Sequence, residues 1–120
     1  MVEIIAIVNR SRALATKAEL HRIGCCGYTQ WPVLGRGRQR GLQNGAGTNA
    51  LPFLPKVMFN IIIDDEQELE TIEAVIRANQ TGQYGDGRIF VSALTEATRI
   101  STGEQSSVGE TSLNLEEVRS

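Results

Sequence analysis

The sequence has 120 residues, which is enough for one domain with a modest core. Hydrophobic residues make up 41% of it and aromatic residues only 5%, so an ordinary globular core must consist mainly of aliphatic side chains. No apolar run is long enough to cross a bilayer, and the start lacks the basic region of a signal peptide, so we expect a cytoplasmic protein without membrane insertion.

The net charge of −2 hides a division between the two halves of the chain. Residues 1–63 carry eight basic and two acidic side chains, a net charge of +6, and residues 64–120 carry four basic and twelve acidic ones, a net charge of −8. This asymmetry indicates either an anionic ligand for the first half or two complementary surfaces that meet in an oligomer.

Residues 3–8 are apolar and β-branched, which predicts a strand. A helix is expected from about residue 11 to 23, with Ser11 as its N-cap and Gly24 just beyond its end. Residues 28–34 are typical of a second strand, and Pro32 favours a position at the edge of a sheet.

The helix carries residues that could suggest chemistry, but no convincing site can be assembled from them. Cys25 and Cys26 are adjacent, neighbouring cysteines seldom pair, and no second pair exists for a zinc site. We therefore expect two reduced thiols packed at the helix end. His21 has neither a second histidine nor a carboxylate cluster nearby, and no convincing Ser–His–acid or Cys–His constellation can be assembled around it, so it is expected on the helix surface.

Residues 35–55 contain five glycines and two prolines, and such a long loop in a compact domain is usually functional or disordered. Residues 56–63 then predict a third strand, in which one face carries the alternate residues Val57, Phe59, Ile61 and Ile63.

A second helix is expected from Asp65 to about Gln80, because Asp65 and Glu68 form a pattern typical of a capping box. Its apolar stripe is predicted to comprise Leu69, Ile72, Val75 and Ile76. A glycine loop at 81–87 leads to a fourth strand at 88–94, and the residues from 101 onward are polar.

This order of elements predicts an α+β fold of the ferredoxin-like βαββαβ type, with two helices on one face of a four-stranded antiparallel sheet. The chain offers nothing to cover the other face, which is also partly apolar. We therefore expect oligomerisation through that open face.

Two glycine-rich loops, GRGRQRG at 35–41 and TGQYGDG at 81–87, are the candidates for function. Glycines let backbone N–H groups approach an anion and arginines bind phosphate, although either loop alone could be a simple turn. No GK[ST] follows the glycines, which excludes a P-loop. An arginine–glycine tract can also bind nucleic acid, but this one is short and lacks an interleaved aromatic residue, so no nucleic-acid partner is expected.

Taken together, GRGRQRG, LPK at 54–56, TGQYGDGRIFVS at 81–92 and RISTGE at 99–104 resemble the PII family of nitrogen-signalling proteins. The resemblance covers residues 1–104, with the family's T-loop at about 36–55, and leaves 105–120 as a flexible tail. It implies a trimer that binds ATP or ADP between subunits, recruits 2-oxoglutarate through Mg-ATP, and regulates target proteins through the T-loop rather than by catalysis.

The resemblance also implies site residues. Those matched to the nucleotide site are Thr29, Gly35, Gly37, Arg38, Gln39, Ile62, Gly85, Asp86, Gly87, Arg88 and Arg99. Those matched to the 2-oxoglutarate site are Gln39, Gly41 and Lys56. The amide oxygen of Gln39 would also ligate Mg²⁺, for which it is a suitable hard ligand.

The sequence departs from the family pattern at several positions. Arg88 stands where lysine is usual, and Ser101 replaces a second phosphate-binding basic residue. The T-loop is about two residues shorter than in the enteric type, and residues 42–53 contain no tyrosine or serine. The common covalent modifications of this loop therefore have no acceptor, and Thr48 is its single hydroxyl.

The unmodifiable T-loop is most similar to the nitrogenase-associated branch of the family, which implies nitrogenase as the target. An ammonium channel and glutamine synthetase are the alternative partners. The trimer could consist of one chain type or include a paralogue. Three alternative hypotheses concern other classes of protein. They are an arginine-loop nucleic-acid binder, a structural trimer that binds no ligand, and an enzyme, although no base or nucleophile is evident near the loops.

Overall fold

A computed structural model describes residues 1–36 and 53–107 of the chain. Within these residues a four-stranded antiparallel sheet has the strand order β2-β3-β1-β4. Its strands are β1 (Val2–Asn9), β2 (Tyr28–Gly35), β3 (Leu54–Ile63) and β4 (Gly87–Ala93). The predicted βαββαβ order is confirmed, and β2 with its Pro32 is an edge strand as expected.

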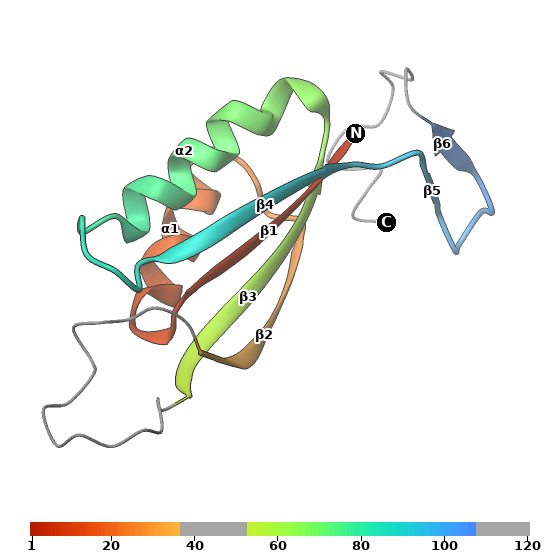
Figure 1. Ribbon diagram of the computed structural model, residues 1–120. Coiled ribbons are helices and arrows are strands. Elements are labelled where there is room, and N and C mark those ends of the chain that lie inside the picture. The colour runs from red at the N-terminus through yellow and green to blue at the C-terminus, as the bar shows by residue number, and fades with distance from the viewer. Residues whose placement is uncertain (37–52, 108–120) are drawn as a thin grey trace, which may run out of the picture.

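Two helices, α1 (Ala13–Arg22) and α2 (Glu68–Asn79), cover one face of this sheet (Figure 1). Short 3-10 turns precede them, η1 (Arg10–Arg12) before α1 and η3 (Asp65–Gln67) before α2. The predicted caps are wrong, because the residues at the N-caps of α1 and α2 are Arg12 and Gln67, and neither makes a side-chain capping bond. In each case a 3-10 turn occupies the positions where the cap was expected.

The core lies between the helices and the sheet, because alternate residues of β1 and β3 are buried there. The predicted alternation of β3 is confirmed, and Phe59 and Ile61 are fully buried. The remaining alternate residues point to the other face, which no element of the described chain covers and which includes Ile5, Ile7, Trp31, Met58, Ile62 and Phe90.

The predicted apolar stripe of α2 is partly wrong. Val75 is buried, but Leu69 is 68% exposed and Ile76 is 41% exposed. The buried face instead includes the smaller residues Thr71, Ala74 and Ala78. Small side chains let α2 pack closely on its neighbours, and the sequence pattern alone did not show which face does so.

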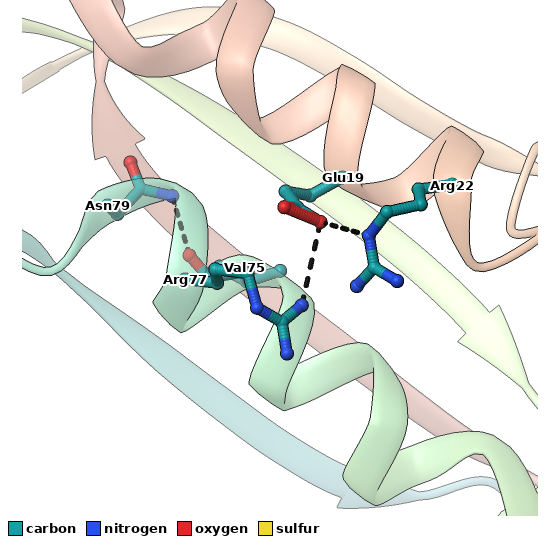
Figure 2. Close-up of polar contacts among 5 residues, drawn as sticks. All are labelled: Glu19, Arg22, Val75, Arg77 and Asn79. Atoms are coloured by element: carbon teal, nitrogen blue, oxygen red, sulfur yellow. Dashed lines mark hydrogen bonds and ion pairs between the residues drawn. The ribbon is translucent and has the colours of Figure 1, made fainter.

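Polar contacts join the two helices (Figure 2). The Glu19 carboxylate on α1 accepts hydrogen bonds from Arg22 at 2.7 Å and from Arg77 of α2 at 3.5 Å. These contacts, the Arg22 hydrogen bond first, lower the pKa of Glu19. The buried Asn79 amide donates to the Thr16 hydroxyl of α1 at 2.9 Å and to the Val75 carbonyl at 2.8 Å.

The residues at the end of α1 differ in their environment. Gly24 adopts the expected left-handed conformation, with a φ of 80°. Cys25 is buried, whereas Cys26 is exposed, so the prediction that both thiols are packed is right only for Cys25. His21 is exposed as expected, and its Nδ1 lies 4.0 Å from the sulfur of Cys26.

Beyond β4, a small hairpin of β5 (Glu96–Thr98) and β6 (Gln105–Ser107) projects from the end of the sheet (Figure 1). β6 contains the first three residues of the segment that the sequence assigned to a tail, and 108–120 lie outside the described residues. Among the residues that are described, no helix combines the length and apolarity that crossing a membrane requires.

Candidate functional site

The glycine loop 81–87 and the two ends of the loop that joins β2 to β3 lie at the same end of the sheet. The antiparallel register places Asn9 opposite Lys56 and Val8 opposite Gly87. Gly35, the last residue of β2, pairs with Leu54, the first residue of β3. The sheet therefore brings together three segments that are far apart in the sequence (Figure 1).

Lys56 is the buried cation at this end of the sheet, with a residue exposure of 4%. Its ammonium donates hydrogen bonds to Asn9 Oδ1 at 2.6 Å and to the Gly85 carbonyl at 3.0 Å. Both acceptors are neutral. Burial lowers the pKa of Lys56, and the charge of Asp86 opposes this shift. A buried ammonium without a hydrogen-bonded carboxylate favours an incoming anion.

Asp86 closes the glycine loop from within. Its carboxylate accepts hydrogen bonds from the backbone N–H of Thr81 at 2.7 Å, from the N–H of Gly82 at 3.0 Å, and from the Thr81 hydroxyl. These bonds, the Thr81 hydroxyl first, lower the pKa of Asp86. The carboxylate thus stabilises the conformation of the loop, as expected for a turn residue.

Gly87 and Gly35 sit where a side chain does not fit. A Cβ on Gly87 would lie 2.2 Å from the Ile7 carbonyl oxygen. The φ of Gly87 is 126°, a backbone angle that favours glycine. A Cβ on Gly35 would lie 2.9 Å from Cγ of Lys56, so the backbone of Gly35 packs directly on the stem of that lysine.

Of the remaining described candidates, Arg88 lies next to Gly87, whereas the others lie toward the opposite end of the sheet. Arg88 is exposed on the open face of the sheet, opposite Ile7. Thr29 lies at the start of β2 and Ile62 near the end of β3, at the opposite end of the sheet from Lys56. Arg99 follows β5, beyond the far end of β4, where its N–H bonds the Glu104 carbonyl at 2.8 Å. One chain therefore holds two separate groups of candidate residues.

The candidates Gly37, Arg38, Gln39 and Gly41 lie outside the described residues. In the described part of the chain no group of three His, Cys, Asp or Glu side chains could hold a metal ion. Gln39, the predicted Mg²⁺ ligand, is not among those residues, so the metal assignment stays a prediction.

Two cavities flank the glycine loop on the helix side of the sheet. One, of about 370 Å³, includes Asn9, Arg12, Thr81 and Tyr84 in its lining. The other, of about 490 Å³, is mainly apolar and lies between α2 and β4, with Ile72, Ile76 and Ile89 among its residues. Asn79 and Asp86 line both cavities.

Sequence reasoning missed Asn9 and Thr81. Both are short polar residues beside elements already identified, Asn9 at the end of the first strand and Thr81 at the start of the glycine loop. Asn9 could have been found from the antiparallel pairing of the first and third strands, which places it opposite Lys56.

A family model and several known proteins match this chain. The family model described as "Nitrogen regulatory protein P-II" matches residues 1–104. A "Nitrogen regulatory protein P-II" from Rhodospirillum rubrum is 44% identical over 108 residues, which cover 88% of this chain and 96% of the relative.

Two further relatives come from archaea. A "Nitrogen fixation nifHD1 region GlnB-like protein 2" from Methanosarcina barkeri is 35% identical over 88% of this chain and 95% of its own length. A "Nitrogen regulatory protein P-II 2" from Methanothermobacter thermautotrophicus is 39% identical over 87% of this chain and 92% of its own length. Because the family model matches most of the chain, the chain belongs to the PII family of nitrogen regulatory proteins, which are signal transducers and not enzymes.

Proposed function

We propose that this protein senses ATP or ADP together with 2-oxoglutarate, and that its T-loop regulates a nitrogen-metabolism target. The buried Lys56 is the observation that carries the proposal. Its ammonium lies between the base of the T-loop and the glycine loop, and its acceptors among the described residues, Asn9 and Gly85, are neutral. A carboxylate of 2-oxoglutarate supplies the negative charge that this position lacks.

The nucleotide part of the proposal rests on the two groups of candidate residues. Gly85, Asp86 and Gly87 lie at one end of the sheet, and Thr29 and Arg99 lie at the other. A site that uses both groups requires two copies of the chain, one supplying each end. This supports a nucleotide cleft between subunits. Gln39 is the proposed Mg²⁺ ligand in that cleft. Because Ser101 stands where the family has a basic residue, the phosphates would have one cationic contact fewer.

Regulation follows from linkage between ligand and loop. A ligand shifts the T-loop only through its different affinity for two loop conformations. Lys56 is two residues from the start of β3, where the T-loop ends, and its stem packs on Gly35, where the T-loop begins. An anion that holds Lys56 therefore acts on both ends of the T-loop at once, and we propose that 2-oxoglutarate dissociates the target complex.

Nitrogenase is the proposed target. Relatives from three methanogen genera carry names that place them in the nifHD region. The absence of tyrosine and serine from residues 42–53 supports direct metabolite sensing without covalent modification. An ammonium channel and glutamine synthetase are the alternative targets, and all three are tested by the same binding experiment with and without 2-oxoglutarate.

Isothermal calorimetry tests the proposal. Mg-ATP is titrated into the purified protein, and 2-oxoglutarate is then titrated with and without Mg-ATP. We expect 2-oxoglutarate to bind only to the ATP-loaded protein. Lys56→Met should weaken this binding at least about tenfold, because a charge-assisted hydrogen bond contributes about 1.5–3 kcal/mol.

The control is Lys17→Met, which removes a cation from α1 in the helix layer instead of from the sheet. This variant should bind both ligands like the wild type. Binding of ATP without any binding of 2-oxoglutarate would make the protein an adenylate sensor and contradict the proposal.

A further inference from the structure

We infer that Asn9 is a positioning residue, whose amide holds the Lys56 ammonium and the Gly85 carbonyl in one arrangement and so links anion binding at Lys56 to the shape of the glycine loop. The identity of the anion as 2-oxoglutarate rests on the proposed function. The link between Asn9, Lys56 and the loop rests on their contacts alone.

Three hydrogen bonds form a closed triangle at the end of the sheet. Lys56 Nζ donates to Asn9 Oδ1 at 2.6 Å and to the Gly85 carbonyl at 3.0 Å. Asn9 Nδ2 donates to the same Gly85 carbonyl at 2.9 Å. The three residues come from the end of β1, the start of β3 and the loop before β4.

The orientation of the Asn9 amide is fixed by its two partners. An ammonium can only donate, so the amide oxygen must face Lys56, and a carbonyl can only accept, so the amide nitrogen must face Gly85. An aspartate at this position would place an oxygen against the Gly85 carbonyl and a negative charge on Lys56. Asparagine is therefore a side chain that satisfies both partners and adds no negative charge beside Lys56.

This arrangement prepares Lys56 for a ligand. An ammonium has three donors, and within residues 1–36 and 53–107 Asn9 and Gly85 take two of them, which leaves one for an incoming carboxylate. Gly35 packs on the lysine stem and limits its other conformations. Because a positioned side chain loses less conformational entropy on binding, the triangle raises the affinity of Lys56 for an anion.

The same triangle links the position of Lys56 to the hydrogen bonds of the glycine loop. The Gly85 carbonyl accepts from both Asn9 and Lys56, and the next residue, Asp86, holds the N–H groups of Thr81 and Gly82. A shift of Lys56 toward a ligand therefore changes the hydrogen bonding of the loop itself. By reciprocity, a loop held in its present conformation binds the anion better.

The first test measures the loop without any ligand. Hydrogen exchange of the backbone N–H groups at 82–87 is compared in the wild type, Asn9→Ala, Lys56→Met and the double variant. Each single variant should speed exchange about three- to tenfold, the effect of losing hydrogen bonds worth about 1 kcal/mol. The double variant should be little faster than either single variant, because both remove the same triangle.

The matched control is Asn60→Ala. Asn60 is another half-buried asparagine on the same sheet face, and its amide donates to Glu3 at 2.6 Å. Its loss should leave exchange at 82–87 unchanged. Exchange in Asn9→Ala equal to that in the wild type, or equal acceleration in Asn60→Ala, overturns the inference whether or not 2-oxoglutarate binds.

The second test measures the ligand by calorimetry on the Mg-ATP-loaded protein. Asn9→Ala should weaken 2-oxoglutarate binding about three- to tenfold, and Asn9→Asp should weaken it further by pairing with Lys56. Unchanged affinity in both variants, with a wild type that does bind, overturns the inference and leaves the proposed function intact. A wild type that does not bind 2-oxoglutarate refutes the proposed function, while the exchange experiment still decides the role of Asn9.

Discussion

At the scale of single residues, the structure assigns opposite titration behaviour to two aspartates. Hydrogen bonds from Thr81 and Gly82 lower the pKa of Asp86 below 3.8, whereas burial raises the pKa of Asp64 above 3.8. For Asp86 the ionised form is the one that closes the loop. The ionised Asp86 carboxylate therefore contributes its full stabilisation at pH values above its pKa in the unfolded chain. This stabilisation is lost as the pH falls through the pKa of Asp86 in the folded protein.

We predict that the N–H signals of Thr81 and Gly82 move together in an NMR titration, with a midpoint below 3.8. Asp64 should titrate above 3.8 in the same samples, which provides an internal control of opposite sign. Asp86→Asn should abolish the transition at Thr81 and Gly82, since an amide does not ionise in this range. A midpoint for those two signals at or above 3.8 would show that the Asp86 hydrogen bonds are weaker than the structure indicates.

At the scale of the elements, the start of β4 depends on a glycine that contacts β1. Gly87→Ala should destabilise the protein by at least about 3 kcal/mol, because the new Cβ meets the Ile7 carbonyl oxygen in a backbone conformation that alanine adopts only under strain. Gly24→Ala is the control. It also has a positive φ but lies in open space, so it should cost only about 1–2 kcal/mol in denaturant unfolding. Equal losses in the two variants would show that contact with β1 is unimportant.

At the scale of the whole molecule, the open face of the sheet supports the proposal of a trimer. Phe90 lies on this face with 49% exposure, and its neighbour across the ladder is Ile5. Trp31, Met58 and Ile62 extend the apolar surface over the other strands. An apolar surface of this extent is typical of a protein–protein interface.

Light scattering after size exclusion should give the mass of three 13.1 kDa chains for the wild type. Phe90→Asp should shift the mass toward the monomer, because it places a charge in the proposed interface. Leu14→Asp, at a 77% exposed position on α1 and away from the open face, should leave the trimer intact. A trimer that persists in Phe90→Asp would place the interface elsewhere.

The sequence by itself determined the order of the four main strands and two helices and the edge position of β2, but not the short strands β5 and β6. A β-branched apolar run marked the first strand, alternation with a period of two marked the third, and glycine marked the end of α1. It did not determine which face of α2 is buried or how α1 and α2 begin. Helix rotation and capping depend on what the neighbouring elements leave room for, and an exposed Leu69 looks the same in a sequence as a buried one.

The sequence also named Lys56 and the glycine loop as candidates, through motifs that stand together in one family. Only the tertiary structure brought in Asn9, because its role exists only when β1 lies antiparallel to β3 and next to β4. It also separated Arg99 from the glycine loop by the length of β4. A motif records residue types along the chain, whereas the pairing of strands decides which of them share one end of the sheet.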